Sequence, residues 1–272
     1  MTDVGGTSYH THSHYCDGAG EIAEMIEAAI AAGLSEIGIS SHAPLPFVTG
    51  WTMPPERLAE YAAEVRELQR RYGDRIKVRF AAEIDYIPNA EVTAFQERAI
   101  FPLNFDYFVG SVHFLGQPDS PRSFDDTEPG FHAILAEEYA DDISAMVTDY
   151  YERMSRVPEI PGVRIIGHLD RIKRWNAERR DFTGDEPWYR AAVEETLRAL
   201  AGSGTIVELN TSGWRKGPDE PYPAPWILAR CRDLGIPITI NSDAHSPAEV
   251  DSGFDRARAL LAELSIEPVA LG

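Results

Sequence analysis

Short apolar, β-rich segments alternate with amphipathic segments along nearly the whole chain, and this alternation limits the fold more than any other feature. It is typical of a parallel sheet whose crossover connections are helices. We expect strands near residues 7–10, 36–40, 77–84, 107–113, 163–167, 205–209 and 238–241. We expect helices at residues 21–32, 55–71, 130–156, 186–201, 224–234 and 254–264. Seven strands with no break in composition favour one closed or distorted barrel over a doubly wound sheet, with residues 1–272 forming a single domain.

The composition agrees with one acidic globular domain. The 272 residues are 43% hydrophobic, which is enough apolar material for one large core. The net charge of −19 should repel a polyanion, so the sequence argues against a nucleic-acid substrate. No apolar stretch is long enough to cross a bilayer. Residues 1–6 contain neither a positive side chain nor an apolar run, so we expect no secretory signal and a cytoplasmic protein.

Nearly every expected strand ends in a histidine or a carboxylate. In parallel β/α barrels the carboxyl ends of the strands meet at one face, and that face holds the active site. Ligand-type side chains that are scattered along the sequence should therefore meet in space. The residues at these strand ends are His10, His42, Glu83, His113, His168 and Asp243.

A cluster of histidines near the N-terminus is the first candidate metal site. His10, His12 and His14 occupy alternate positions, and Asp17 follows them. On an extended segment residues two apart face the same side, so His10 and His12 can face one ion. His14 can be a third ligand, a group that faces the substrate, or a solvated loop residue. Cys16 lies among these residues and is a weaker candidate ligand, because nitrogen and oxygen ligands are abundant nearby.

A second cluster lies near the C-terminus, where Asp243 and His245 again stand two residues apart. They can be two ligands, or a ligand and a proton donor, and Asp243 or Ser246 can also cap the last helix. Glu83 follows an apolar run, where a carboxylate is costly to bury unless it binds a cation or a proton. Each single histidine at a strand end could by itself be a satisfied core residue.

Taken together, these residues and their contexts resemble the PHP superfamily, the polymerase and histidinol phosphatase type, from residue 10 to about residue 254. The resemblance rests on His10, His12, Asp17, Gly18, His42, Glu83, His113, His168, Asp243 and His245. Within the superfamily, residues 82–86, 110–114, 167–174, 208–213 and 242–247 resemble the histidinol phosphatases.

The resemblance implies an α/β fold, a distorted (β/α)7 TIM-like barrel of PHP type, with the active site at the carboxyl ends of the strands. It also implies three divalent transition-metal ions, for which members of the family use zinc, iron or manganese. In the family pattern, His10, His12, Glu83 and Asp243 bind the first ion, Glu83 bridges to a second ion held by His113 and His168, and Asp17, His42 and His245 hold the third.

The activity that the resemblance implies is hydrolysis of L-histidinol phosphate to L-histidinol and phosphate in histidine biosynthesis. Paired metal ions suit this reaction because they can activate water for attack on phosphorus. Two alternatives stay open. One is another phosphoesterase of the superfamily, acting on a small nucleotide or on phosphotyrosine, and the other is a non-catalytic metal-binding regulatory domain.

Basic residues in the segments that resemble substrate loops are the expected phosphate contacts. We expect Arg174 and Arg215 to bind the phosphate, because a guanidinium matches phosphate with a planar fork of donors. Their neighbours Lys173 and Lys216 could take the same role.

The rest of the substrate and the proton transfer need further groups. Glu208 or Asp85 could pair with the protonated amine of the substrate. His245 or a metal-bound water could protonate the leaving oxygen, and we place Asp243 with His245 in the catalytic group. The loop at residues 116–128 is rich in Pro, Asp and Ser, and it is the best candidate for a mobile lid.

Overall fold

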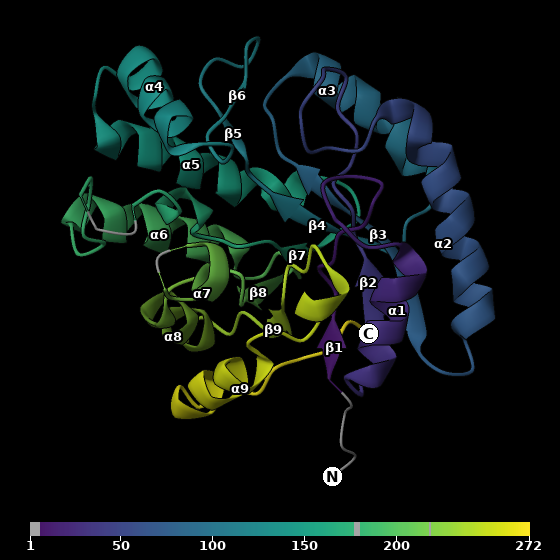
Figure 1. Cartoon of the computed structure of the whole chain (residues 1–272). Coiled ribbons are helices and arrows are strands. Elements are labelled where there is room, and N and C mark those ends of the chain that lie inside the picture. Colours follow the sequence, from purple (N-terminus) through teal and green to yellow (C-terminus); the bar gives the residue numbers. More distant parts are fainter. Residues whose placement is uncertain (1–5, 177–179, 218) are drawn as a thin grey trace.

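The computed structural model describes residues 6–176, 180–217 and 219–272, and its centre is a sheet of seven parallel strands. The strands follow the order β1-β2-β3-β4-β7-β8-β9, so neighbours in the sheet are also neighbours along the chain apart from the short β5–β6 excursion (Figure 1). Their bounds are β1 Thr7–Ser8, β2 Glu36–Ile39, β3 Lys77–Asp85, β4 Tyr107–Ser111, β7 Val163–Ile166, β8 Ile206–Asn210 and β9 Ile238–Asn241. All seven expected strands are confirmed.

The first and last strands meet beyond their ends and close the barrel. β1 is only two residues long, so the seam depends on the residues that follow it. The backbone N–H of His12 donates to the carbonyl of Ala244 at 2.7 Å, and that of Tyr9 donates to the side-chain oxygen of Asn241 at 2.8 Å. The expected distorted TIM-like barrel is therefore confirmed, with its weakest seam beside the two polar clusters.

Helices surround the barrel, as Figure 1 shows. Those that match an expected helix are α1 Ile22–Ala31, α2 Leu58–Tyr72, α5 Ile143–Arg156, α6 Pro187–Leu200, α8 Pro225–Asp233 and α9 Phe254–Glu263. Helix α1 illustrates why they form: Ile22, Met25, Ile26 and Ala29 are buried and follow the helical period, so one face packs on the sheet. No helix in the described part of the chain is long and apolar enough to cross a membrane.

The prediction of a single helix at residues 130–156 is wrong in one respect, because the segment forms two helices. Helix α4, Glu128–Tyr139, ends where Ala140 and Asp141 adopt left-handed backbone conformations, with φ of 52° and 62°. Asp142 then caps α5 by accepting a hydrogen bond from the N–H of Ala145. The sequence marks this break only weakly, since Asp often occurs inside helices as well. Two short helices, α3 Ala90–Phe95 and α7 Gly213–Lys216, were also not expected.

The interior of the barrel changes from apolar to polar along its axis. Near the amino ends of the strands the interior is filled by Tyr9, Ala81, Tyr107, Val109, Ile165, Ile206 and, from the C-terminal tail, Leu271. Because alternate residues of a strand share a face, Glu83 follows Ala81 on the inner face of β3, and Glu208 follows Ile206 on that of β8. The alternation thus places the histidines and carboxylates of the candidate centre inside the barrel near the carboxyl ends of the strands, while the ion pair of Arg79 and Glu36 lies near the amino ends.

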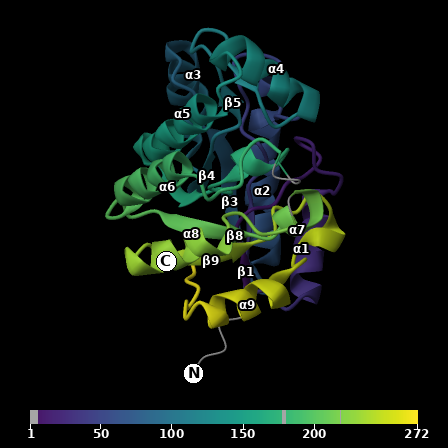
Figure 2. The same cartoon turned by 90° about the vertical axis from the view of Figure 1, so that its left-hand side faces the viewer.

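The segment expected as a lid begins in a small hairpin. Strand β5, Phe114–Leu115, pairs antiparallel with β6, Arg122–Ser123. Buried Arg153 of α5 donates to the carbonyl oxygens of Phe114 at 3.1 Å and Gly116 at 2.7 Å, which fixes the first arm. The turn, residues 117–120, is exposed, so motion stays a prediction for the tip, whereas the stem is anchored. In Figure 2 this hairpin lies toward the same end of the molecule as α3 and α4, away from α9.

Candidate metal centre and substrate cavity

Glu83 lies at the centre of the polar end of the barrel and is almost fully buried. Its Oε2 atom lies 3.0 Å from His10 Nε2, 3.4 Å from His12 Nε2 and 3.0 Å from His42 Nδ1. Its Oε1 atom faces the opposite group, 2.9 Å from His168 Nε2 and 3.7 Å from His113 Nε2. The two oxygens of one carboxylate therefore face two separate sets of imidazoles, which is the arrangement that a carboxylate bridging two ions requires.

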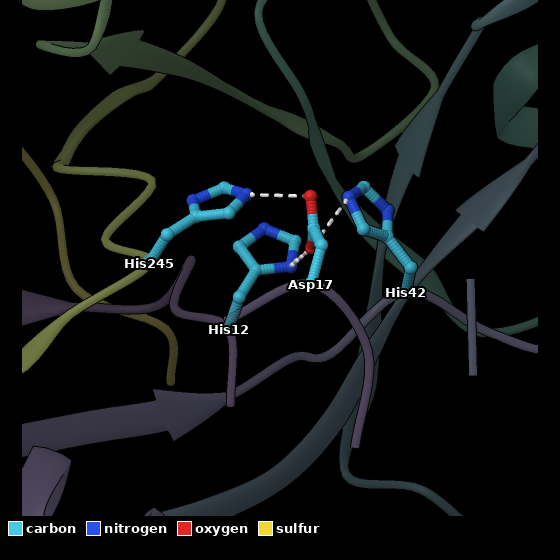
Figure 3. Close-up of side chains that lie close together, drawn as sticks. All are labelled: His12, Asp17, His42 and His245. Atoms are coloured by element: carbon cyan, nitrogen blue, oxygen red, sulfur yellow. Dashed lines mark ion pairs between the residues drawn. The ribbon is translucent and has the colours of Figure 1, made fainter. Parts of the chain in front are cut away.

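Asp17 lies at the centre of a further group, which Figure 3 shows. Its Oδ2 lies 3.3 Å from His245 Nε2, and its Oδ1 lies 3.8 Å from His42 Nε2 and 4.0 Å from His12 Nδ1. The four side chains come from the loop after β1, the end of β2 and the end of β9, so only the closed barrel brings them together. One carboxylate and three imidazoles form a competent nitrogen and oxygen ligand set for a transition metal.

Asp243 connects these groups. Its Oδ1 lies 3.2 Å from His12 Nε2 and 3.5 Å from His245 Nδ1, while its Oδ2 accepts a hydrogen bond from Ser212 Oγ at 3.1 Å. The Asp243 backbone is left-handed, with φ of 52°, a conformation that costs roughly 1 kcal/mol or more for a residue with a side chain. The seam bond from His12 to Ala244 holds the next residue in place. Backbone strain here thus accompanies a side chain that points into the centre.

Several ring nitrogens of this cluster lack hydrogen-bond partners and are available to bind metal ions. His12 Nε2, His42 Nδ1 and His168 Nδ1 are buried and have no hydrogen-bond partner, although carboxylate oxygens lie close to the first two. Burial lowers the pKa of His12 to about 4 and that of His42 to about 3, so both rings are neutral at neutral pH and offer a lone pair. Buried imidazoles that face carboxylates without hydrogen-bonding them fit a shared cation.

Two outer carboxylates orient the imidazoles, and this overturns the substrate role that we expected of them. Glu208 is fully buried, and its oxygens lie 3.1 and 3.0 Å from His10 Nδ1. They also accept hydrogen bonds from the backbone N–H of His168 and from the side-chain amides of Asn210 and Asn241. Since every oxygen is engaged beneath His10, Glu208 does not reach a substrate.

Asp85 has the same function for His113. Its Oδ1 lies 2.9 Å from His113 Nδ1 and accepts a hydrogen bond from the His113 N–H at 2.9 Å. Burial lowers the pKa of His113, but the charges of Asp85 and Glu83 outweigh this and raise it to about 9. A carboxylate behind a ligating histidine fixes the orientation of the ring and makes it more basic. Asp85 is therefore a support for His113 and not a partner for the substrate amine.

A cavity of about 340 Å³ opens over the cluster and carries the basic groups. Besides the ligand-type residues, it is lined by Gly50, Trp51, Asp125, Asp126, Arg171, Arg174 and Lys216. Arg174 therefore lies where a phosphate contact was expected. Arg171, Asp125 and Trp51 are functional candidates that the sequence reasoning missed. Arg171 could have been found, because it stands only three residues after His168. Asp125 lies in the loop at residues 116–128, which its composition marked only as a candidate lid, and Trp51 enters the site through a loop that no pattern marks.

Of the other basic residues considered, Lys216 lines the cavity, whereas Arg215 and Lys173 are engaged by neighbouring protein groups. Arg215 does not line the cavity, because its Nη2 donates to the carbonyl of Ser242 at 2.9 Å and its Nε lies 3.6 Å from Glu249. Its neighbour Lys216 lines the cavity instead. Lys173 is buried and forms an ion pair with Asp170 at 2.7 Å. The phosphate role expected of Arg215 therefore passes to Lys216.

The remaining residues of the N-terminal cluster lie outside this centre. His14 does not line the cavity, and its Nδ1 lies 3.3 Å from the exposed Glu21, so of the three roles considered only the loop residue fits. Cys16 Sγ lies 3.5 Å from His12 Nδ1, behind the ring rather than in a ligand group. Burial raises the pKa of the Cys16 thiol to about 11, so without a bound metal ion it is protonated at neutral pH.

The fold and this multi-histidine centre define the class of protein. The family model of the PHP domain matches residues 8–212, which include most of the centre. The chain belongs to the PHP domain family.

Within the family, several of its relatives are histidinol-phosphatases. A probable histidinol-phosphatase from Deinococcus radiodurans is 34% identical and covers 90% of this chain and 88% of its own length. The histidinol-phosphatase of Bacillus subtilis is 26% identical and covers 90% of this chain and 96% of its own length. A histidinol phosphate phosphatase from Lactococcus lactis subsp. lactis, solved in complex with zinc, L-histidinol and phosphate, shares the fold with a TM-score of 0.70. That structure is 24% identical and covers 97% of this chain and 95% of its own.

Proposed function

We propose that this protein is a metal-dependent phosphomonoesterase that hydrolyses L-histidinol phosphate to L-histidinol and phosphate. The observation that carries the proposal is a cavity in which guanidiniums stand beside a cluster of buried imidazoles and carboxylates. The identity of 34% to a probable histidinol-phosphatase over nine tenths of the chain supports the same substrate. We place the reaction in histidine biosynthesis and in the cytoplasm, on a free small molecule and not on nucleic acid.

We propose that three ions occupy the centre. One would lie between the Oε2 side of Glu83 and Asp243, one on the Oε1 side of Glu83, and one beside Asp17. Zinc, which is present in the related structure, fits this set of nitrogen and oxygen ligands, as do iron and manganese. When bound, the ions would activate water and offset the charge of the phosphoryl group. The proposed ligands are His10, His12, Asp17, His42, Glu83, His113, His168, Asp243 and His245.

The substrate would lie with its phosphate toward Arg171, Arg174 and Lys216, which line the cavity. Arg171 Nη1 is buried and has no hydrogen-bond partner, so it is free to donate to a phosphoryl oxygen. His245 lines the same cavity beside Asp243, so it would protonate the leaving oxygen if it does not hold the third ion, whereas a metal-bound water would supply the proton if it does.

The leaving group would lie at the mouth of the cavity. Asp126 lines it and has no cationic partner among the residues that the structure describes, so we assign it to the substrate amine in place of Glu208. Trp51 provides an aromatic wall, because its ring lies 4.6 Å from the ring of His42 and 5.2 Å from that of His113. Planar aromatic surfaces of this kind suit the imidazole ring of histidinol.

The test compares kcat/KM on histidinol phosphate, phosphotyrosine and a nucleoside monophosphate with the metal-loaded protein. We expect histidinol phosphate to be preferred by at least about a hundredfold, because it alone of the three offers both a protonated amine to Asp126 and an imidazole side chain to Trp51. Asp126→Asn should reduce this preference while leaving the slow rate on an aryl phosphate unchanged.

Each rival makes a different prediction in the same assay. A nucleotide or phosphotyrosine phosphatase would prefer its own substrate, and Asp126→Asn would then have no selective effect. A non-catalytic metal-binding domain would bind metal and turn over none of the substrates, including the aryl phosphate. Either result would overturn the proposal.

A further inference from the structure

Asp125, at the end of the hairpin segment, holds both guanidiniums of the cavity. Its Oδ1 accepts a hydrogen bond from Arg171 Nε at 2.9 Å, and its Oδ2 accepts one from Arg171 Nη2 at 2.8 Å. Arg174 Nη1 donates to the same Oδ2. The Asp125 side chain is only 12% exposed. One carboxylate thus binds Arg171 in a bidentate manner and Arg174 at a single point.

This contact decides where the remaining nitrogen of Arg171 points. A guanidinium is planar and rigid, so fixing Nε and Nη2 also fixes the direction of Nη1. Nη1 is buried, has no hydrogen-bond partner and belongs to a side chain that lines the cavity. Nη1 forms an ion pair with Oδ2 of Asp243 at 3.8 Å, which is beyond hydrogen-bond distance, and that oxygen already accepts a hydrogen bond from Ser212 Oγ. Arg171 is therefore held with one donor presented to the cavity and none given to the metal cluster.

The backbone beside Asp125 is fixed from two sides. The N–H of Phe124 donates to the carbonyl of His113 at 3.1 Å, and the indole N–H of Trp175 donates to the carbonyl of Phe124 at 2.9 Å. His113 follows β4, and Trp175 follows Arg174 after the short 3-10 helix η5, Arg171–Lys173. Asp125 therefore has a defined position relative both to the metal cluster and to the segment that carries the two arginines.

We propose that Asp125 is a positioning residue that orients Arg171 and Arg174 for phosphate and keeps Arg171 Nη1 from hydrogen-bonding Asp243. This inference takes one point from the proposed function, namely that the two guanidiniums bind a phosphate. Asp125 lines the cavity, but both of its carboxylate oxygens are engaged by the two guanidiniums. It acts through the guanidiniums, and without it Asp243 is the carboxylate that Arg171 can reach.

The experiment measures the Kd of inorganic phosphate for the metal-loaded protein by isothermal titration calorimetry, with the metal content of each variant. Asp125→Asn keeps the size of the side chain but removes its charge and one acceptor, so the Kd should rise about tenfold. The KM for the phosphate ester should rise by a similar factor, with a smaller change in kcat and with metal content unchanged. Asp125→Glu, which restores the charge, should recover part of the affinity. Asp119→Asn, at the exposed tip of the same hairpin, is the matched control and should behave like the wild type.

A double-mutant cycle with Arg171→Lys separates positioning from a direct contact. If Asp125 acts through Arg171, the double variant should bind phosphate no more weakly than the weaker single variant. Additive losses, an unchanged Kd in Asp125→Asn, or loss of metal from that variant would each overturn the proposal. Failure of the proposed function would look different, because the wild type would then bind phosphate but not turn over histidinol phosphate.

Discussion

Glu83 is the residue that connects the two sets of candidate metal ligands. Each of its two oxygens faces a separate set of histidines, and Oε1 also accepts a hydrogen bond from Ser111 at 2.6 Å. Burial raises the pKa of the Glu83 carboxyl, but the charge of His10 outweighs this and holds it well below its ordinary value. A charged, buried carboxylate survives in such a place only if cations or hydrogen bonds compensate it.

Glu83→Gln should therefore abolish the activity without unfolding the chain. Glutamine keeps the shape but removes the negative charge and replaces one ligand oxygen by an amide N–H₂, which cannot bind a cation. We expect kcat/KM to fall by roughly a thousandfold or more, with loss of metal and an unchanged far-ultraviolet circular dichroism spectrum. Glu36→Gln is the matched control, because Glu36 pairs with Arg79 at the opposite end of the barrel. Near-normal turnover and metal content in Glu83→Gln would show that this carboxylate bridges no ions.

At the scale of the elements, the break between α4 and α5 is set by backbone conformation. Ala140 ends α4 in a left-handed conformation, which is unfavourable for a residue with a side chain and natural for glycine. Ala140→Gly should therefore raise Tm by about 2 °C in a thermal melt, after the greater chain entropy of glycine has offset part of the gain. Ala136→Gly, on the exposed side of α4, should lower Tm by about 2–4 °C, because glycine inside a helix costs about 1 kcal/mol. Equal losses in the two variants would contradict a break determined by Ala140.

The whole molecule should depend on its ions for stability as well as for activity. The two buried carboxylates Glu83 and Asp243, the more exposed Asp17 and a net charge of −19 favour the bound cations, and a ligand that binds only the folded state adds its binding free energy to stability. Protein purified without chelators should carry more than one transition-metal ion per chain by elemental analysis. Removing the ions should lower Tm by on the order of 10 °C.

Reconstitution supplies the control for that prediction. Zinc, iron or manganese should restore Tm, whereas magnesium should not, since it prefers a shell of oxygen ligands and the centre is rich in imidazole. A stoichiometry at or below one, unchanged by added metal, would exclude a multinuclear centre.

The sequence by itself determined the barrel and the members of its centre. Apolar runs of strand length followed by His or carboxylate residues predicted all seven strands and the face at which their polar ends meet, because hydrophobic periodicity and ligand chemistry are local properties. His42, Glu83 and His168 could be proposed as ligands for that reason. The break after α4 could not be predicted, because neither Ala140 nor Asp141 is a glycine, the residue type that marks a left-handed helix end in a sequence.

The tertiary structure decided which charged groups face the cavity. Arg215 and Arg171 look equally suitable in the sequence, yet Arg171 lines the cavity, while Arg215 is held against the backbone of Ser242 and does not line it. Glu208 looks like a partner for an amine until the folded barrel buries it beneath His10. Asp125 becomes important only because the hairpin brings it against residues 171–174. The type of a side chain is fixed by the sequence, but its free hydrogen-bonding capacity depends on neighbours that are distant in the chain, and only folding brings these together.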